Sequence, residues 1–310
     1  MPSYSGVRNL AAVYQAVGAG QWTNLAGDIG LFAAGLGTTN VISYVKISNV
    51  GNSIDFGDLS SAVWGTSGCS SSTRGLFAGI TNYKSINYVS ITSAGNAQNF
   101  GDLITESFFG AACSSSTRGV FAGGSYSSRV NVMEYVTIAS AGNATDFGDL
   151  LAATEGLAGC SSSTRGIFAG GEISGSRTNV IQYITIASAG NATDFGDLTL
   201  TRGTLSSSSS STRGLFGGGY TGAVNSNVID YITIASIGNA TDFGDLTVAT
   251  GYLASCSSST RALFGGGEAS GAVNTITYVT IASAGNSTTF GQLLNSVYGL
   301  AACSNAHGGL

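Results

Sequence analysis

The sequence predicts an all-β protein, a single β-propeller of four-stranded antiparallel blades. One motif recurs six times in 310 residues, and its fullest copy (residues 160–198) reads C-S-S-S-T-R-G-I-F-A-G-G, a variable stretch, then N-V-I-Q-Y-I-T-I-A-S-A-G-N-A-T-D-F-G-D-L. The phenylalanine of D-F-G-D-L, or its equivalent, returns at spacings of 44, 47, 48, 48 and 47 residues. That period is typical of propeller blades. Because the chain holds about 6.6 such units, we expect one closed array rather than two globular domains.

Each repeat divides into four strand-like runs, described here for the copy at residues 156–198. Run A (156–164) is rich in Ala, Cys and Ser, and run B (166–171) reads G-I-F-A-G-G. Run C (179–187) reads N-V-I-Q-Y-I-T-I-A, and run D (193–198) reads T-D-F-G-D-L. Val, Ile, Thr, Tyr and Phe favour strands, while Gly, Asn and Ser interrupt them. The small side chains of run A suit the innermost strand, and the aromatics of runs C and D suit the wider gaps between blades.

The number of blades depends on how the ring closes. Seven segments resemble run A, but only six complete sets of runs B, C and D follow them. We expect seven blades, the last a composite of residues 294–310 and 1–20, because the apolar segment 7–19 can supply a strand. The alternative is six blades with one redundant run A. Within the single domain of residues 1–310, the complete repeats span approximately 21–59, 64–103, 108–150, 156–198, 204–246 and 252–293.

The amino-acid sequence of the repeat supports a resemblance to a known family. The F-A-G-G segment after run B, the Tyr of run C and the aromatic of run D resemble a kelch-type repeat, although Phe replaces the expected Trp and the Tyr-to-Phe gap of 12 residues is long. The segments C-S-S-S-T-R-G-V-F-A-G-G (113–124) and Y-V-T-I-A-S-A-G-N-A-T-D-F-G-D-L (135–150) are similar to kelch-like repeat proteins of marine tailed phages, especially those of cyanobacteria. This resemblance, which covers roughly residues 21–305, implies a virion structural role.

Comparison of the copies predicts one variable face and one uniform face. Insertions occur only between runs B and C, and the D–A connectors keep their length but change their residues. In an antiparallel blade these two connections emerge on the same face, and variable loops on a rigid scaffold often bind partners. The alternative is that the loops drift without constraint. The candidate binding residues on this face are Trp64, Tyr83, Lys84, Phe108, Tyr126, Arg129, Glu155, Glu172, Arg177, Arg202, Tyr220, Tyr252 and Glu268, with Glu106, Phe109 and Tyr298 beside them. For Phe108, Phe109 and Tyr298 the alternative is burial at the start of run A.

Composition argues against several classes of partner. Charged residues make up 9% of the chain and the net charge is -5, with no basic stripe, so we expect no nucleic-acid binding. No apolar run reaches the length of a membrane span, and the N-terminus lacks a signal-peptide pattern. We therefore expect synthesis in a host cytoplasm and a final location on the virion. A surface with little charge also favours packing against other virion proteins or copies of the same chain.

We interpret the arginine, cysteine and asparagine residues that recur in the repeats as structural residues of the fold. We expect the repeat arginines to satisfy turn carbonyls or to line the uniform mouth of the channel, with an anion site as the remaining alternative. We interpret the repeat cysteines as small buried thiols and not as disulfides or metal ligands. The Asn of each N-A-T or N-S-T sequence is interpreted as a turn residue instead of a glycosylation site. The structural ring comprises Arg74, Arg118, Arg165, Arg213 and Arg261 with Cys69, Cys113, Cys160 and Cys256, and Cys303 is a further counterpart.

These patterns predict a protein that is not an enzyme and needs no cofactor. His307 is the only histidine, so a His-based triad or a multi-His metal site cannot form. The leading interpretation is a virion structural or accessory component of a tail, fibre or capsid surface, with the variable face binding protein or the host surface. The alternative is a lectin-like adhesin that uses aromatic and carboxylate residues. A glycan-active enzyme with a pair of glutamates is the remote alternative.

Overall fold

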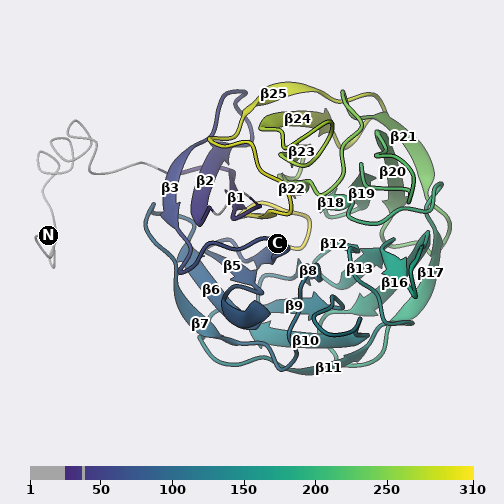
Figure 1. Cartoon of the computed structure of the whole chain (residues 1–310), viewed down its shortest axis with the longest axis horizontal. Coiled ribbons are helices and arrows are strands. Elements are labelled where there is room, and N and C mark those ends of the chain that lie inside the picture. Colours follow the sequence, from purple (N-terminus) through teal and green to yellow (C-terminus); the bar gives the residue numbers. More distant parts are fainter. Residues whose placement is uncertain (1–24, 37–38) are drawn as a thin grey trace, which may run out of the picture.

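The chain forms a six-bladed β-propeller of four-stranded antiparallel sheets arranged around a central axis (Figure 1). The computed structural model describes residues 25–36 and 39–310. The innermost strands carry the small residues of run A, as predicted. They are β26 (Ala301–Ser304), β4 (Ser67–Ser70), β8 (Ala111–Ser114), β12 (Ala158–Ser161), β18 (Ser206–Ser209) and β22 (Ala254–Ser257).

The next three strands of each blade follow the predicted runs B, C and D. The second strands are β1 (Ile29–Ala33), β5 (Arg74–Ala78), β9 (Arg118–Ala122), β13 (Arg165–Ala169), β19 (Arg213–Gly217) and β23 (Arg261–Gly265). The third strands are β2 (Val41–Lys46), β6 (Ser85–Ser90), β10 (Val132–Thr137), β16 (Val180–Thr185), β20 (Val228–Thr233) and β24 (Thr275–Thr280). The outer strands are β3 (Ile54–Asp58), β7 (Gln98–Asp102), β11 (Thr145–Asp149), β17 (Thr193–Asp197), β21 (Thr241–Asp245) and β25 (Thr288–Gln292).

The expectation of seven blades is wrong, and the six-blade alternative is correct. Strand β26 does not belong to a composite seventh blade, because it pairs with β1 as the innermost strand of blade 1, which has the order β26-β1-β2-β3. Residues 25–28, the described part of the first run-A-like segment, form no strand. The strand expected from residues 1–20 lies outside the described residues. Blades 2 to 6 then follow in chain order, and a hairpin of β14 (Glu172–Ile173) and β15 (Ser176–Arg177) extends from blade 4.

The repeat phenylalanine has a structural reason for its position. In every blade the register between third and outer strands shifts by one residue, and the Phe is the extra residue of this bulge, as Phe147 is between Asp146 and Gly148. Its ring contacts the repeat Tyr of the same blade edge-on, with centroids 5.9–6.1 Å apart in all six copies. The bulge therefore directs a large side chain into the gap between blades.

Candidate functional site

The two faces of the propeller are separated as the antiparallel topology requires. In blade 2, the connector after β7 bonds to the loop after β5, since Ser107 N donates to Tyr83 O at 2.8 Å. On the opposite face, Arg74 begins β5, directly after the turn that joins β4 to β5. Its side chain donates to Ala139 O, in the turn between the third and outer strands of blade 3, at 2.8 Å. We call these ends the variable face and the uniform face.

The repeat arginines of the uniform face hold neighbouring blades together. Each guanidinium lies over the Tyr ring of its own blade, 4.2–4.8 Å from the centroid, and donates to a turn carbonyl of the next blade at 2.8–3.2 Å. Ile29 takes the equivalent position in blade 1 and is fully buried. These arginines are thus engaged with turn carbonyls, the first of the two roles expected for them.

The repeat asparagines form a second set of contacts between blades. In all six copies the Asn Oδ1 accepts from a backbone N–H of the preceding blade's outer strand, at 3.0–3.1 Å. The Asn191 side chain, for example, bonds Asp149 N. The asparagines of the N-A-T and N-S-T sequences therefore have a structural role in these turns.

The repeat cysteines are free, buried, and packed against a glycine of the next blade. A Cβ at Gly214 would lie 3.0 Å from Cys160 Sγ, and one at Gly119 would lie 2.7 Å from Cys69 Sγ. Burial raises the pKa of the Cys160 and Cys303 thiols to about 12, with a smaller opposing effect from a nearby serine in each case. Thiols in this state are poor nucleophiles.

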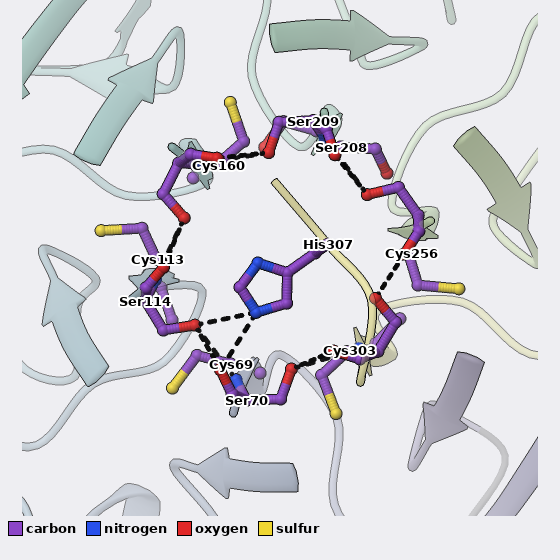
Figure 2. A pocket seen from close by; sticks show the side chains of 18 of the residues that line it. Cys69, Ser70, Cys113, Ser114, Cys160, Ser208, Ser209, Cys256, Cys303 and His307 are labelled. Carbon is purple, nitrogen blue, oxygen red and sulfur yellow. Dashed lines mark hydrogen bonds between the residues drawn. The ribbon is translucent and has the colours of Figure 1, made fainter. Parts of the chain in front are cut away.

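A ring of six serines encircles the axis near the uniform face (Figure 2). Each hydroxyl donates to the carbonyl of the equivalent serine in the preceding blade at 2.6–2.8 Å, so the ring closes on itself. Figure 2 shows His307 inside this ring and the cysteine sulfurs directed away from it. The serines are Ser70, Ser114, Ser161, Ser209, Ser257 and Ser304.

Residues 305–310 enter the channel from the uniform face. His307 Nδ1 accepts from Gly309 N at 3.1 Å, so the proton of the neutral ring is on Nε2, which lies 3.0 Å from Ser70 O. Gly308 N donates to Ser209 O at 3.0 Å. Burial lowers the pKa of His307, with a smaller opposing contribution from the bond to Ser70. The only histidine is therefore a neutral structural group within the axis.

A ring of backbone hydrogen bonds closes the axis at the variable face. Six residues, one before each innermost strand, donate N–H to the carbonyl of the equivalent residue before the preceding blade's innermost strand, at 2.6–2.8 Å. All six have left-handed backbone, with φ between 52 and 69°. We call this the mouth ring, and it comprises Gly65, Phe109, Gly156, Thr204, Tyr252 and Gly299.

Aromatic side chains gather over this mouth ring. Phe109 and Tyr252 come from opposite sides of the ring, yet their centroids lie 5.5 Å apart. Trp64 contacts three neighbours edge-on at 4.9–6.1 Å. The aromatic cluster comprises Trp64, Tyr83, Phe108, Phe109, Tyr126, Tyr252 and Tyr298, all half-buried except Tyr126, which is 61% exposed.

Charged side chains from blades 3 and 4 form a paired network beside the aromatic rings. Arg129 contacts both Glu155, at 2.7 Å, and Glu172, and Arg177 contacts Glu172 from the β14–β15 hairpin. Ser125 also donates to Glu155. We call these four charged residues the ion-paired cluster. They are part-exposed, at 15–28% of the side chain, so the network is accessible from solvent.

Tyr252 lies where these two clusters meet. Its ring contacts Phe109 and also Tyr298, at 5.9 Å. Burial raises its pKa, and smaller contributions come from Arg177, which lowers it, and from Glu268 and Glu172, which raise it. The hydroxyl is therefore protonated at neutral pH and can donate a hydrogen bond. Arg177 also lies 5.4 Å from the Tyr220 ring centroid, which extends the site toward blade 5.

One predicted binding residue is not on the surface. The Arg202 side chain is 0% exposed and pairs with Asp230, also 0% exposed, at 2.9 Å. Its guanidinium further donates to Gly218 O and Phe216 O, at 2.9 and 3.1 Å. The prediction that Arg202 is a binding residue is therefore wrong. Its guanidinium lies in the interior because it pairs there with the buried carboxylate of Asp230 in the following blade. Lys84 and Glu268 remain part-exposed on the variable face, and Glu268 is in no ion pair among residues 25–36 and 39–310.

Sequence reasoning missed the axial rings, although their signals are visible in the repeats. The serine that follows each cysteine position is present in all six copies. The mouth ring is harder to detect, because its six positions hold Gly, Phe, Gly, Thr, Tyr and Gly. Only the shared left-handed backbone shows that these different residues are equivalent.

Comparisons with known proteins leave the family open. No protein-family model matches the chain, and no curated protein matches it. Within the described residues, no three His, Cys, Asp or Glu side chains are grouped to hold a metal ion. The described part of the chain also contains no helix long and apolar enough to cross a membrane.

Proposed function

We propose that this chain is a non-enzymatic β-propeller that serves as a virion structural or accessory component and presents its variable face to a partner. The virion assignment rests on the sequence of the repeat, which resembles that of phage kelch-like proteins. The observation that carries the binding role is the aromatic cluster beside the ion-paired cluster. Aromatic and arginine side chains are the usual anchors of binding surfaces.

The distribution of contacts supports this choice of face. On the uniform face, arginines and asparagines are bonded to neighbouring blades, and residues 305–310 enter the channel. On the variable face, differing side chains extend from equivalent scaffold positions. A rigid scaffold that presents variable residues is suited to binding.

The polar groups support a binding role over catalysis. His307 bonds within the channel, and both Glu155 and Glu172 contact arginines. A general acid needs a carboxyl group that keeps its proton near neutral pH, and a carboxylate paired with arginine is poorly suited to that task.

Mass spectrometry of purified particles tests the virion assignment, and we expect stoichiometric amounts of this chain. A Trp64→Ala/Tyr252→Ala variant should be incorporated or should adsorb to hosts less well than the parent. An Ile237→Ala variant is the matched control, because Ile237 is 60% exposed in a C–D turn of the uniform face, and it should behave as the parent does. Particles that lack the chain would overturn the proposal.

A further inference from the structure

We propose that the variable face binds a neutral saccharide in a site centred on Tyr252, between the aromatic cluster and the ion-paired cluster. This inference rests on the proposed function in taking the variable face as the binding face. It adds the chemical class of the ligand and the residues that contact it.

The backbone of the mouth ring is the first observation. Glycine adopts left-handed backbone without strain, and Gly65, Gly156 and Gly299 use it here. Phe109 and Tyr252 adopt the same conformation at φ 55 and 54° and carry large rings. A non-glycine residue in this region is strained, and such strain clusters at binding sites. These two rings occupy positions where glycine would fold with less strain, so we infer that they serve binding.

The chemistry of the two clusters fits a sugar. A sugar ring has one face of C–H groups and a rim of hydroxyls. The C–H groups carry small positive charge and suit the electron-rich faces of aromatic rings. The hydroxyls need both donors and acceptors. Arg177, the Tyr252 hydroxyl and the Glu268 carboxylate supply them. Glu268 exchanges backbone hydrogen bonds with Gly251, next to Tyr252, and Arg177 lies over the ring of Tyr220, which bonds to Gly203 before the mouth-ring residue Thr204.

The balance of charge selects a neutral ligand. In the ion-paired cluster, Arg129 and Arg177 are matched by Glu155 and Glu172, and Glu268 adds one negative charge. The chain as a whole has a net charge of -5. A sulfated, sialylated or uronic glycan would meet no unpaired arginine here and would be repelled over longer range. A neutral ligand rich in hydroxyls would bind arginine and glutamate side chains that their ion pairs already hold in place. Less side-chain conformational entropy is then lost on binding.

The first experiment applies the fluorescently labelled intact chain to an array of neutral, sialylated and sulfated oligosaccharides. We expect signal on a subset of the neutral glycans and none that is confined to the acidic ones. The best neutral oligosaccharide is then titrated by calorimetry against the parent and its variants. An array without signal overturns the inference, and so does binding restricted to acidic glycans.

Four variants locate the site. Tyr252→Phe and Glu268→Gln each remove one polar contact, and each should weaken binding by about tenfold. Tyr252→Gly removes the ring and relieves the backbone strain, so binding should be lost while the melting temperature stays close to that of the parent. Tyr183→Phe, which removes a phenol hydroxyl on the uniform face, should leave the affinity unchanged. Unchanged affinity in Tyr252→Gly would overturn the site.

The outcomes separate this inference from the proposed function. If the chain is on purified particles and face variants impair adsorption, but the array is silent, the ligand is a protein and only the saccharide inference fails. If particles lack the chain but Tyr252-dependent glycan binding is measured, the virion role fails and the saccharide site stands.

Discussion

At the junction of blades 5 and 6, two residues of the repeat change together. Ser208 replaces the cysteine present in the other five innermost strands, and Ala262 replaces the glycine that faces this position elsewhere. Where the cysteine is present, its sulfur leaves little or no space for a Cβ on the facing residue. The hydroxymethyl of Ser208 is smaller than a cysteine side chain and leaves room for the methyl of Ala262. The smaller residue in one blade is thus compensated by the larger residue in the next, and the junction stays packed.

This compensation predicts a double-mutant result. Ser208→Cys alone should crowd Ala262 and lower the free energy of unfolding by about 1–3 kcal/mol. Ser208→Cys combined with Ala262→Gly reproduces the other junctions and should recover most of that loss. Urea unfolding of both variants measures the coupling, with Cys160→Ser as a control that leaves a void against Gly214. Equal losses in the single and double variants would show that the two positions do not interact.

The thiols allow a second test at the scale of residues. All five cysteines are buried, and burial raises the pKa of Cys160 and Cys303 to about 12. Because the thiolate is the reactive form, a disulfide reagent at pH 8 should modify none of the five in the folded protein over minutes. All five should react in denaturant. Rapid labelling of even one thiol in the native protein would show that its blade junction opens.

Residues 305–310 form an element whose stability should depend on pH. Burial lowers the pKa of His307 below its ordinary value of 6.5, so between these two pKa values the unfolded chain binds a proton that the folded chain does not. Stability should therefore be complete above about pH 6.5 and should fall as the pH drops below it. Protonation would also place a proton on Nδ1, where Gly309 N–H donates.

Melting temperatures measured from pH 8 to pH 5 test this dependence. His307→Gln should show a smaller decrease at acidic pH than the parent, because glutamine has no proton to gain. Since carboxylates titrate at lower pH, the difference between the two proteins should develop near pH 6. Parallel curves for the two proteins would contradict the assignment.

At the scale of strands, much of the fold could be predicted because each blade repeats a local pattern. Runs A to D match the four strands, and the alternation of connections predicted two faces. The blade count was predicted wrongly because ring closure is not local. Residues 21–28 resemble run A, but strand β26, from the other end of the chain, takes that place beside β1.

The site could be predicted only in part, for a related reason. The variable connectors identified most of its residues. Their side-chain directions depend on partners in other blades: Arg202 turns inward to Asp230, 28 residues later, while Phe109 and Tyr252 meet across the axis. The spacing of residues along the chain does not reveal contacts of this kind.

For the whole molecule, stability depends on closing the ring. The innermost strand of blade 1 comes from residues 301–304. Asn305 then bonds to residues near the other end of the sequence: its side chain donates to Gly27 O at 2.9 Å and accepts from Ile29 N at 2.8 Å, and we call this pair of bonds the Asn305 clasp. Strand β26 also supplies Ser304, one of the six members of the serine ring. Each blade buries its faces on its neighbours, so an open ring exposes apolar surface on both sides of the seam.

Deletion of residues 301–310 should therefore abolish the cooperative unfolding transition and expose surface that binds a hydrophobic dye. Deletion of residues 306–310 is the matched control, since it removes His307 but keeps β26, Ser304 and the Asn305 clasp. The control should still unfold cooperatively at a moderately lower temperature, because it loses the hydrogen bonds within the channel but no blade contact. Calorimetry of both deletions measures the difference. A cooperative transition in the longer deletion would show that five complete blades and a three-stranded remnant are stable without closure.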